Sequence, residues 1–139
     1  MNLLKKVHHY GGNMNIVLET ELIPGEWFEK LRRSNAGSLI FHYAVVKDQS
    51  GDKPSSGIRF ERGGDMEAEM SAIEADIRLR WPVEDVLLVR RLGELRVGDL
   101  ISLVAVSAAA SGHAFEACQY GLSLLKKMTR IKKTELFLD

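Results

Sequence analysis

The chain has 139 residues, 45% of them hydrophobic and 27% charged, and its 19 basic and 19 acidic residues cancel. Such values are typical of one globular domain, and no window reaches the roughly 20 apolar residues that a membrane span requires. The neutral balance and a pI near 6.9 argue against a strongly basic nucleic-acid-binding domain. We therefore expect a single cytoplasmic domain.

The N-terminal segment lacks the long apolar core and small-residue cleavage site of a signal peptide. A second methionine, Met14, stands just before the first good strand. We therefore expect residues 1–13 to be a disordered extension and residues 14–139 to form the domain.

Cys118 is the only cysteine, which excludes an intramolecular disulfide and a zinc cluster. It lies at helical spacing with Phe115, Leu122 and Leu125. This spacing predicts a buried apolar stripe in which the thiol packs as a small core residue and is not a nucleophile.

The first half of the chain alternates apolar strands with polar breaks. Residues 38–46 are apolar at both alternating sets of positions, so we expect this strand to be central in its sheet. The polar stretch 47–57 predicts a mobile loop. The other elements expected here are a strand at 15–22, a short helix after Pro24-Gly25 that carries Trp27, Phe28 and Leu31, and a strand at 58–62.

The second half predicts two longer helices and three strands. Asp65 is a plausible N-cap for a helix that runs to Trp81 and ends at Pro82. Its acidic residues, Glu67, Glu69, Glu74 and Asp76, should form the solvated side. The remaining elements are strands at 86–92 and 100–109 joined by a glycine-containing hairpin at 93–99, a helix at about 112–128 with Ser111 as its N-cap, and a last strand at 130–137.

Strands joined by hairpins and interspersed with helices favour an α+β domain over a doubly wound parallel sheet. We expect one domain with a mixed or antiparallel sheet and about three helices.

Positive charge is concentrated after the last helix. Five of the eight residues from Lys126 to Lys133 are cationic. Such a cluster in a neutral protein indicates an anion site. The alternative is that Lys126 and Lys127 favour the negative end of the helix dipole while Lys132 and Lys133 are solvated surface charge.

Short motifs follow one another in a fixed order through the second half of the chain. They are Arg91-Leu92-Gly93-Glu94-Leu95, Gly98-Asp99, Ala114-Phe115-Glu116-Ala117, Lys126, and Ile131-Lys132-Lys133 with Glu135. In this order they resemble the catalytic (large) subunit family of molybdopterin synthase. The similarity runs from about Gly37 to Glu135 and implies a hammerhead-like α+β fold.

The resemblance also implies an activity in molybdenum cofactor biosynthesis. Members of the family transfer sulfur to cyclic pyranopterin monophosphate and so form molybdopterin. The sulfur arrives as a thiocarboxylate on the Gly-Gly C-terminus of a small ubiquitin-like subunit. A homodimer of large subunits within a heterotetramer is implied, with no metal and no organic cofactor of its own.

Two lysines are implied as the catalytic pair, because Lys126 and Lys133 match the two lysines that the family uses at its active site. Both bound species are anions, which lysines in a partly closed pocket would stabilise. The candidate substrate-binding residues are Lys47, Arg91, Ser111, His113 and Arg130. Of these, Arg91 matches a family arginine and is as well suited to a strand-end ion pair.

The chain also departs from the family pattern. Ala110-Ser111 stands where the family has His-Arg, with His113 two residues beyond the missing histidine. Lys47 replaces a strand-end arginine, which keeps the charge and loses the bidentate fork. The family's Pro-x-Trp-Lys appears here as the segment from Arg130 to Lys133.

Three hypotheses follow. The chain is a working catalytic subunit, or a diverged paralogue that keeps the fold and dimer as a binding or scaffold protein, or a nucleic-acid-binding protein. The third is weakest because the basic segment lacks interleaved aromatic residues for base stacking.

Overall fold

The computed structural model describes residues 13–32 and 35–138. The predicted extension at 1–13 lies outside the described residues except for Asn13, which begins the first strand. In the described part, no helix is long and apolar enough to cross a membrane.

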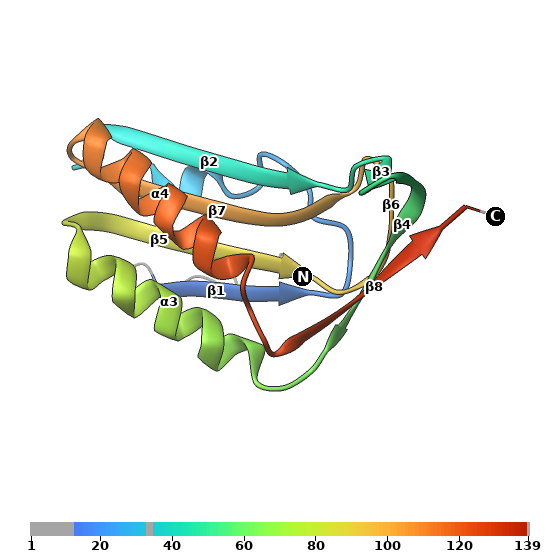
Figure 1. Ribbon diagram of the computed structural model, residues 1–139. Helices are drawn as coiled ribbons and strands as arrows, with labels where there is room; N and C mark the ends of the chain where they lie inside the picture. Colours follow the sequence, from blue (N-terminus) through green and yellow to red (C-terminus); the bar gives the residue numbers. More distant parts are fainter. Residues whose placement is uncertain (1–12, 33–34, 139) are drawn as a thin grey trace.

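The larger sheet has four strands in the order β1-β5-β7-β2 (Figure 1). β1 runs parallel to β5, and the other two pairings are antiparallel. The strands are β1 (Asn13–Leu18), β5 (Val83–Arg91), β7 (Leu100–Ala108) and β2 (Ser38–Val45). The mixed pairing confirms an α+β domain.

The expectation that the strand at 38–46 is central was wrong, because β2 is an edge strand that pairs only with β7 among the described residues. Its apolar faces are explained by layers above and below the sheet. Ile40 packs against the core on one side, and Leu39 and Phe41 pack against the core on the other. Coverage of both faces does not require a neighbouring strand at both edges.

Two helices cover one face of this sheet, and shorter segments cover the other (Figure 1). α3 (Met66–Arg80) and α4 (Ser111–Leu125) pack against each other and against the sheet through a core that includes Ile77, Val104 and Leu125. The opposite core contains Trp27 and the short helix α2 (Phe28–Leu31). The described residues thus form three helices, as predicted.

A second, smaller sheet lies beyond the end of the first (Figure 1). Its central strand β4 (Lys53–Arg62) pairs with β3 (Gln49–Ser50), β6 (Gly93–Arg96) and β8 (Ile131–Phe137). β6 approaches β4 so closely that a Cβ at Gly57 would lie 2.0 Å from the carbonyl oxygen of Leu95. Glycine is therefore required at that point.

Two loop predictions were wrong in this region. Residues 47–57 contain β3 and the first half of β4, which is longer than the predicted strand at 58–62. Residues 93–99 do join two antiparallel strands, but part of the connection leaves the first sheet and forms β6 in the second. Polar composition concealed both strands because an exposed sheet needs few apolar residues.

The helix ends agree only in part with the sequence. Asp65 is the N-cap of α3, and its carboxylate accepts a hydrogen bond from the N–H of Ala68 at 3.0 Å, as predicted. Ser111 is not the N-cap of α4, which is Ala110, and no side chain caps that end. Cys118 is buried as predicted, whereas Phe115 is 61% exposed and lies off the apolar stripe.

The acidic side of α3 is not simply solvated. Glu74 is buried and accepts hydrogen bonds from Arg78 at 2.8 Å and from Asn15 at 3.1 Å. Asp76 accepts hydrogen bonds from the Tyr120 hydroxyl and, second in effect, from Arg80, and both lower its pKa. Of the four acidic residues, Glu67 and Asp76 form ion pairs with arginines, Arg62 and Arg80, that are themselves exposed.

Candidate functional site

The C-terminal end of α4 presents Lys126 to solvent. Lys126 is the C-cap residue, and its backbone N–H still donates to the carbonyl of Leu122 at 3.0 Å. The residue before it, Leu125, is buried. A cation here is favoured by the negative end of the helix dipole, and its ammonium group is available to a ligand.

Lys133 is presented by β8 of the second sheet. It lies directly opposite Phe60 of β4, so both side chains stand on the same face. Its Nζ atom lies 3.9 Å from Oε2 of Glu135, and the side chain is 58% exposed. Glu135 is itself held by the Ser55 hydroxyl, which donates to its Oε1 at 2.8 Å.

A buried arginine connects these two places. Arg90, near the end of β5, is 6% exposed and donates from Nη1 to the carbonyl of Leu125 at 3.3 Å. Its guanidinium lies 5.0 Å from the centre of the Phe60 ring, a cation–π contact. Arg90 therefore touches the residue before Lys126 and the cross-strand neighbour of Lys133.

Burial lowers the pKa of Arg90 to about 10, and the nearby negative charge of Glu69 opposes this shift. The guanidinium is therefore still a cation near neutral pH. The sequence motifs indicate Arg91 and not the adjacent Arg90, because Arg91 is the residue that matches the family pattern. The signal that could have revealed it is a charged residue inside the apolar run of a predicted strand.

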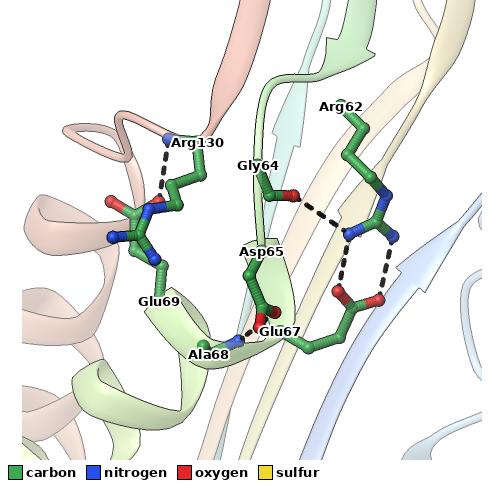
Figure 2. A network of polar contacts seen from close by, with 7 residues as sticks. All are labelled: Arg62, Gly64, Asp65, Glu67, Ala68, Glu69 and Arg130. Carbon is green, nitrogen blue, oxygen red and sulfur yellow. Dashed lines mark hydrogen bonds and ion pairs between the residues drawn. The ribbon is translucent and has the colours of Figure 1, made fainter.

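The segment between the two lysines is held by α3. Figure 2 shows the Glu69 side chain beside Arg130, whose backbone N–H donates to Glu69 Oε1 at 2.9 Å. Oε2 accepts from the N–H of Thr129 at 2.8 Å. The carbonyl of Arg130 in turn accepts from the N–H of Gly63 at 2.9 Å. Glu69 was predicted to be a solvated side chain, and that prediction was wrong.

Lys47 and Arg91 lie where strands of the larger sheet terminate, at the same end of the sheet as the C-terminus of α4. β2 and β5 are each antiparallel to β7, so they run in the same direction and terminate at the same end of the sheet. Lys47 follows the last residue of β2 by two positions. Arg91 is the last residue of β5 and faces the side away from Arg90. Its Nη1 lies 3.9 Å from Asp99 Oδ2, which agrees with the strand-end ion pair.

Ser111 and His113 lie at the other end of α4 and are exposed. Fifteen residues of helical rise separate Ser111 from Lys126, roughly 22 Å. One chain therefore does not bring these two residues together with the lysines. Arg130, in contrast, lies in the segment between Lys126 and Lys133 and is exposed.

A groove of about 500 Å³ lies elsewhere, on the second sheet. Its lining residues are Ser56, Glu94, Leu95, Arg96, Val97 and Leu136. Leu136 stands on the face of β8 opposite that of Lys133 and Glu135, because side chains alternate along a strand. The groove therefore does not collect the candidate site residues.

The arrangement can bind and stabilise anions. Lys126, Arg130 and Lys133 are exposed cations on adjacent elements, and Arg90 adds a buried cation behind them. Ammonium and guanidinium groups in such a cluster favour phosphate, carboxylate or a developing negative charge. Among residues 13–32 and 35–138, no three His, Cys, Asp or Glu side chains are grouped so that they could hold a metal ion.

Comparison with solved structures gives the same fold. The chain superimposes on molybdopterin synthase from Staphylococcus aureus with a TM-score of 0.81 at 23% identity, covering 91% of this chain and 93% of that one. It also matches a chain of the complex of subunits 1 and 2 of molybdopterin-converting factor from Helicobacter pylori, with a TM-score of 0.73 at 16% identity, covering 88% and 84% of the two chains.

Curated relatives named molybdopterin synthase catalytic subunit match at higher identity. A Nostoc protein is 32% identical over 105 residues, covering 74% of this chain and 64% of that protein. A Pyrococcus abyssi protein is 32% identical over 104 residues, covering 74% and 70% of the two chains. The match thus spans just under two thirds of the Nostoc protein's length. The family model described as MoaE protein matches residues 17–128, and this chain belongs to that family.

Proposed function

We propose that the chain is the catalytic subunit of a molybdopterin synthase. It would transfer sulfur from a thiocarboxylated small ubiquitin-like subunit to cyclic pyranopterin monophosphate. Membership of the family supports this activity. The observation that carries the proposal is the contact path from Leu125 through Arg90 to Phe60, which joins the elements that bear Lys126 and Lys133.

In this proposal Lys126 and Lys133 are the catalytic pair. Their ammonium groups would bind the anionic pterin phosphate and the thiocarboxylate, and would stabilise negative charge on the acyl oxygen during sulfur transfer. Arg130 would add a third cation between them. Lys47 and Arg91 would bind substrate at the same end of the larger sheet, where β2 and β5 terminate. Asp99 would partly neutralise the charge of Arg91.

The proposal includes a small partner subunit and a homodimer of the present chain. The structural relative from Helicobacter pylori is a complex of two different subunits, which supports a protein partner. Ser111 and His113 would contribute to the pocket only if a second copy of the chain brings them to Lys126. A cytoplasmic location is part of the same proposal, and cell fractionation would test it.

The decisive experiment reconstitutes the reaction. Purified chain is mixed with the thiocarboxylated small subunit from the same cell and with cyclic pyranopterin monophosphate, and molybdopterin is measured by its fluorescent oxidation product. We expect product from the unmodified chain and at least about a 100-fold lower rate from Lys126→Ala. Lys127→Ala, which removes the neighbouring charge, is the matched control and should stay within about threefold.

A stable complex with the small subunit that yields no product would overturn the proposal and favour a scaffold protein with the same fold. Equal rates for Lys126→Ala and the unmodified chain would instead overturn the assignment of Lys126.

A further inference from the structure

The connection between α4 and β8, residues 126–130, has no helix or strand of its own. α4 ends at Leu125, and β8 begins at Ile131. The N–H groups of Lys127 and Met128 donate to carbonyls of the last turn of α4, so those of Thr129 and Arg130 need partners from elsewhere in the molecule. Those partners determine how Lys126, at the start of the connection, lies relative to β8, which carries Lys133.

One side chain of α3 takes both N–H groups at the end of the connection. Glu69 Oε2 accepts from the Thr129 N–H at 2.8 Å, and Oε1 accepts from the Arg130 N–H at 2.9 Å. The Thr129 hydroxyl lies 3.3 Å from the same Oε2. Hydrogen bonds from amides to a carboxylate are about twice as strong as those between neutral groups.

Other contacts complete the attachment. The Gly63 N–H holds the Arg130 carbonyl at 2.9 Å, and Met128 is buried in the core. Arg90 holds the Leu125 carbonyl at the opposite end of the connection. The negative charge of Glu69 also acts on Arg90, where it opposes the lowering of the pKa by burial.

Glu69 owes its position to the start of α3. Asp65 caps the helix through the Ala68 N–H, and Glu69 follows in the first turn (Figure 2). Its neighbour Glu67 points elsewhere and pairs with Arg62 at 2.6 and 2.9 Å. The two carboxylates of this helical turn therefore bind different partners, and of the two only Glu69 contacts the connection.

We propose that Glu69 is a positioning residue that fixes the connection between α4 and β8, and thereby sets where the ammonium group of Lys126 lies relative to that of Lys133. The inference rests on the proposed function for its catalytic consequence. Glu69 itself touches no substrate in this proposal. It acts through the backbone of Thr129 and Arg130.

The test compares Glu69→Ala, Glu69→Gln and the control Glu67→Ala. Hydrogen exchange of the Thr129 and Arg130 amides is measured by NMR. In the reconstituted reaction, the single-turnover rate and the small-subunit Kd are measured. We expect at least about tenfold faster exchange and an about tenfold lower single-turnover rate for Glu69→Ala, with the Kd within about twofold. Glu69→Gln keeps one acceptor oxygen and should fall between, while Glu67→Ala should match the unmodified chain.

Unchanged exchange in Glu69→Ala would overturn the inference, as would an undiminished single-turnover rate in a chain whose parent is active. A Glu67→Ala variant with the same losses would also overturn it, because general weakening of the helix end would then explain both. An inactive parent chain would count against the proposed function alone. The exchange experiment would then decide the attachment by Glu69 without the reaction.

Discussion

The two ends of α4 differ in how the structure holds them. At the N-terminal end no side chain caps the helix, and Ser111 and His113 are exposed. At the C-terminal end Arg90 bonds the last helical carbonyl, and Glu69 and Gly63 bond the segment that follows. The C-terminal end of the helix is therefore held by residues of other elements, whereas the N-terminal end, at Ala110 and Ser111, has no side-chain cap.

This difference shows which residues determine the positions of the two candidate lysines. Lys126 and Lys133 are both exposed. The contacts that place them are made by their backbone neighbours, and these reach back to α3, β4 and β5. Two lysines joined by a loop need such support, because an unsupported loop samples many arrangements of the residues at its ends.

The largest expected effect comes from replacing one lysine and comparing it with a histidine at the other end of the helix. Lys133→Ala should lower the rate of molybdopterin formation by about 100-fold or more, because a cation near the reacting groups is lost. His113→Ala should cost about tenfold or less, as expected for a single substrate contact. Steady-state rates with both anionic substrates saturating provide the measurement. Equal losses would show that both ends act in one pocket with equal weight.

A second prediction concerns the middle of α4, where Cys118 seats the helix on the sheet. Burial raises the pKa of its thiol from 9.0 to about 11, and its Sγ lies 3.6 Å from the Val104 carbonyl. Between these values the unfolded chain ionises first and binds fewer protons than the folded chain, so stability is lost as pH rises. Between pH 8 and 10.5 this group should cost about 2 kcal/mol of unfolding free energy.

Urea unfolding of the unmodified chain and of Cys118→Ala across that pH range provides the check. The variant should lack this part of the decline, because all other titrating groups are shared. If the unfolding free energies of the two chains fell in parallel with pH, the thiol would be accessible to water. The middle of α4 would then not be packed tightly against the sheet.

Much of the fold was predictable because apolar alternation and helix caps are local signals. The alternation at 38–46 predicted β2, and the Asp65 cap predicted the start of α3. The place of β2 in the sheet was not predictable in this way. Burial of both faces reports the layers around a strand, and pairing reports its neighbours. The polar stretch 53–56 concealed the start of β4 because one face of a small sheet is open to water.

The candidate site was predictable only in its exposed cations. Lys126 and Lys133 stand out by charge and by family motif. Arg90 and Glu69 act through partners 35 and 60 or more residues away, and no periodicity within a window reports such contacts. Whether Ser111 and His113 belong to the site also depends on distance across the fold, which spacing in the sequence cannot give.

The smallest expected effect compares two helix starts. Asp65→Ala removes the hydrogen bond to the Ala68 N–H and should lower the unfolding free energy by about 1 kcal/mol. Ser111→Ala should change it by less than about 0.5 kcal/mol, because the N-cap of α4 is Ala110 and no side chain caps that end. Urea midpoints at constant m-value measure both. Since Asp65 begins the turn that carries Glu69, its loss should also speed exchange of the Thr129 amide, whereas Ser111→Ala should leave that amide unchanged. If Ser111→Ala lowered the unfolding free energy more than Asp65→Ala, the Ser111 side chain would stabilise the start of α4. The contrast between the two ends of α4 would then be wrong.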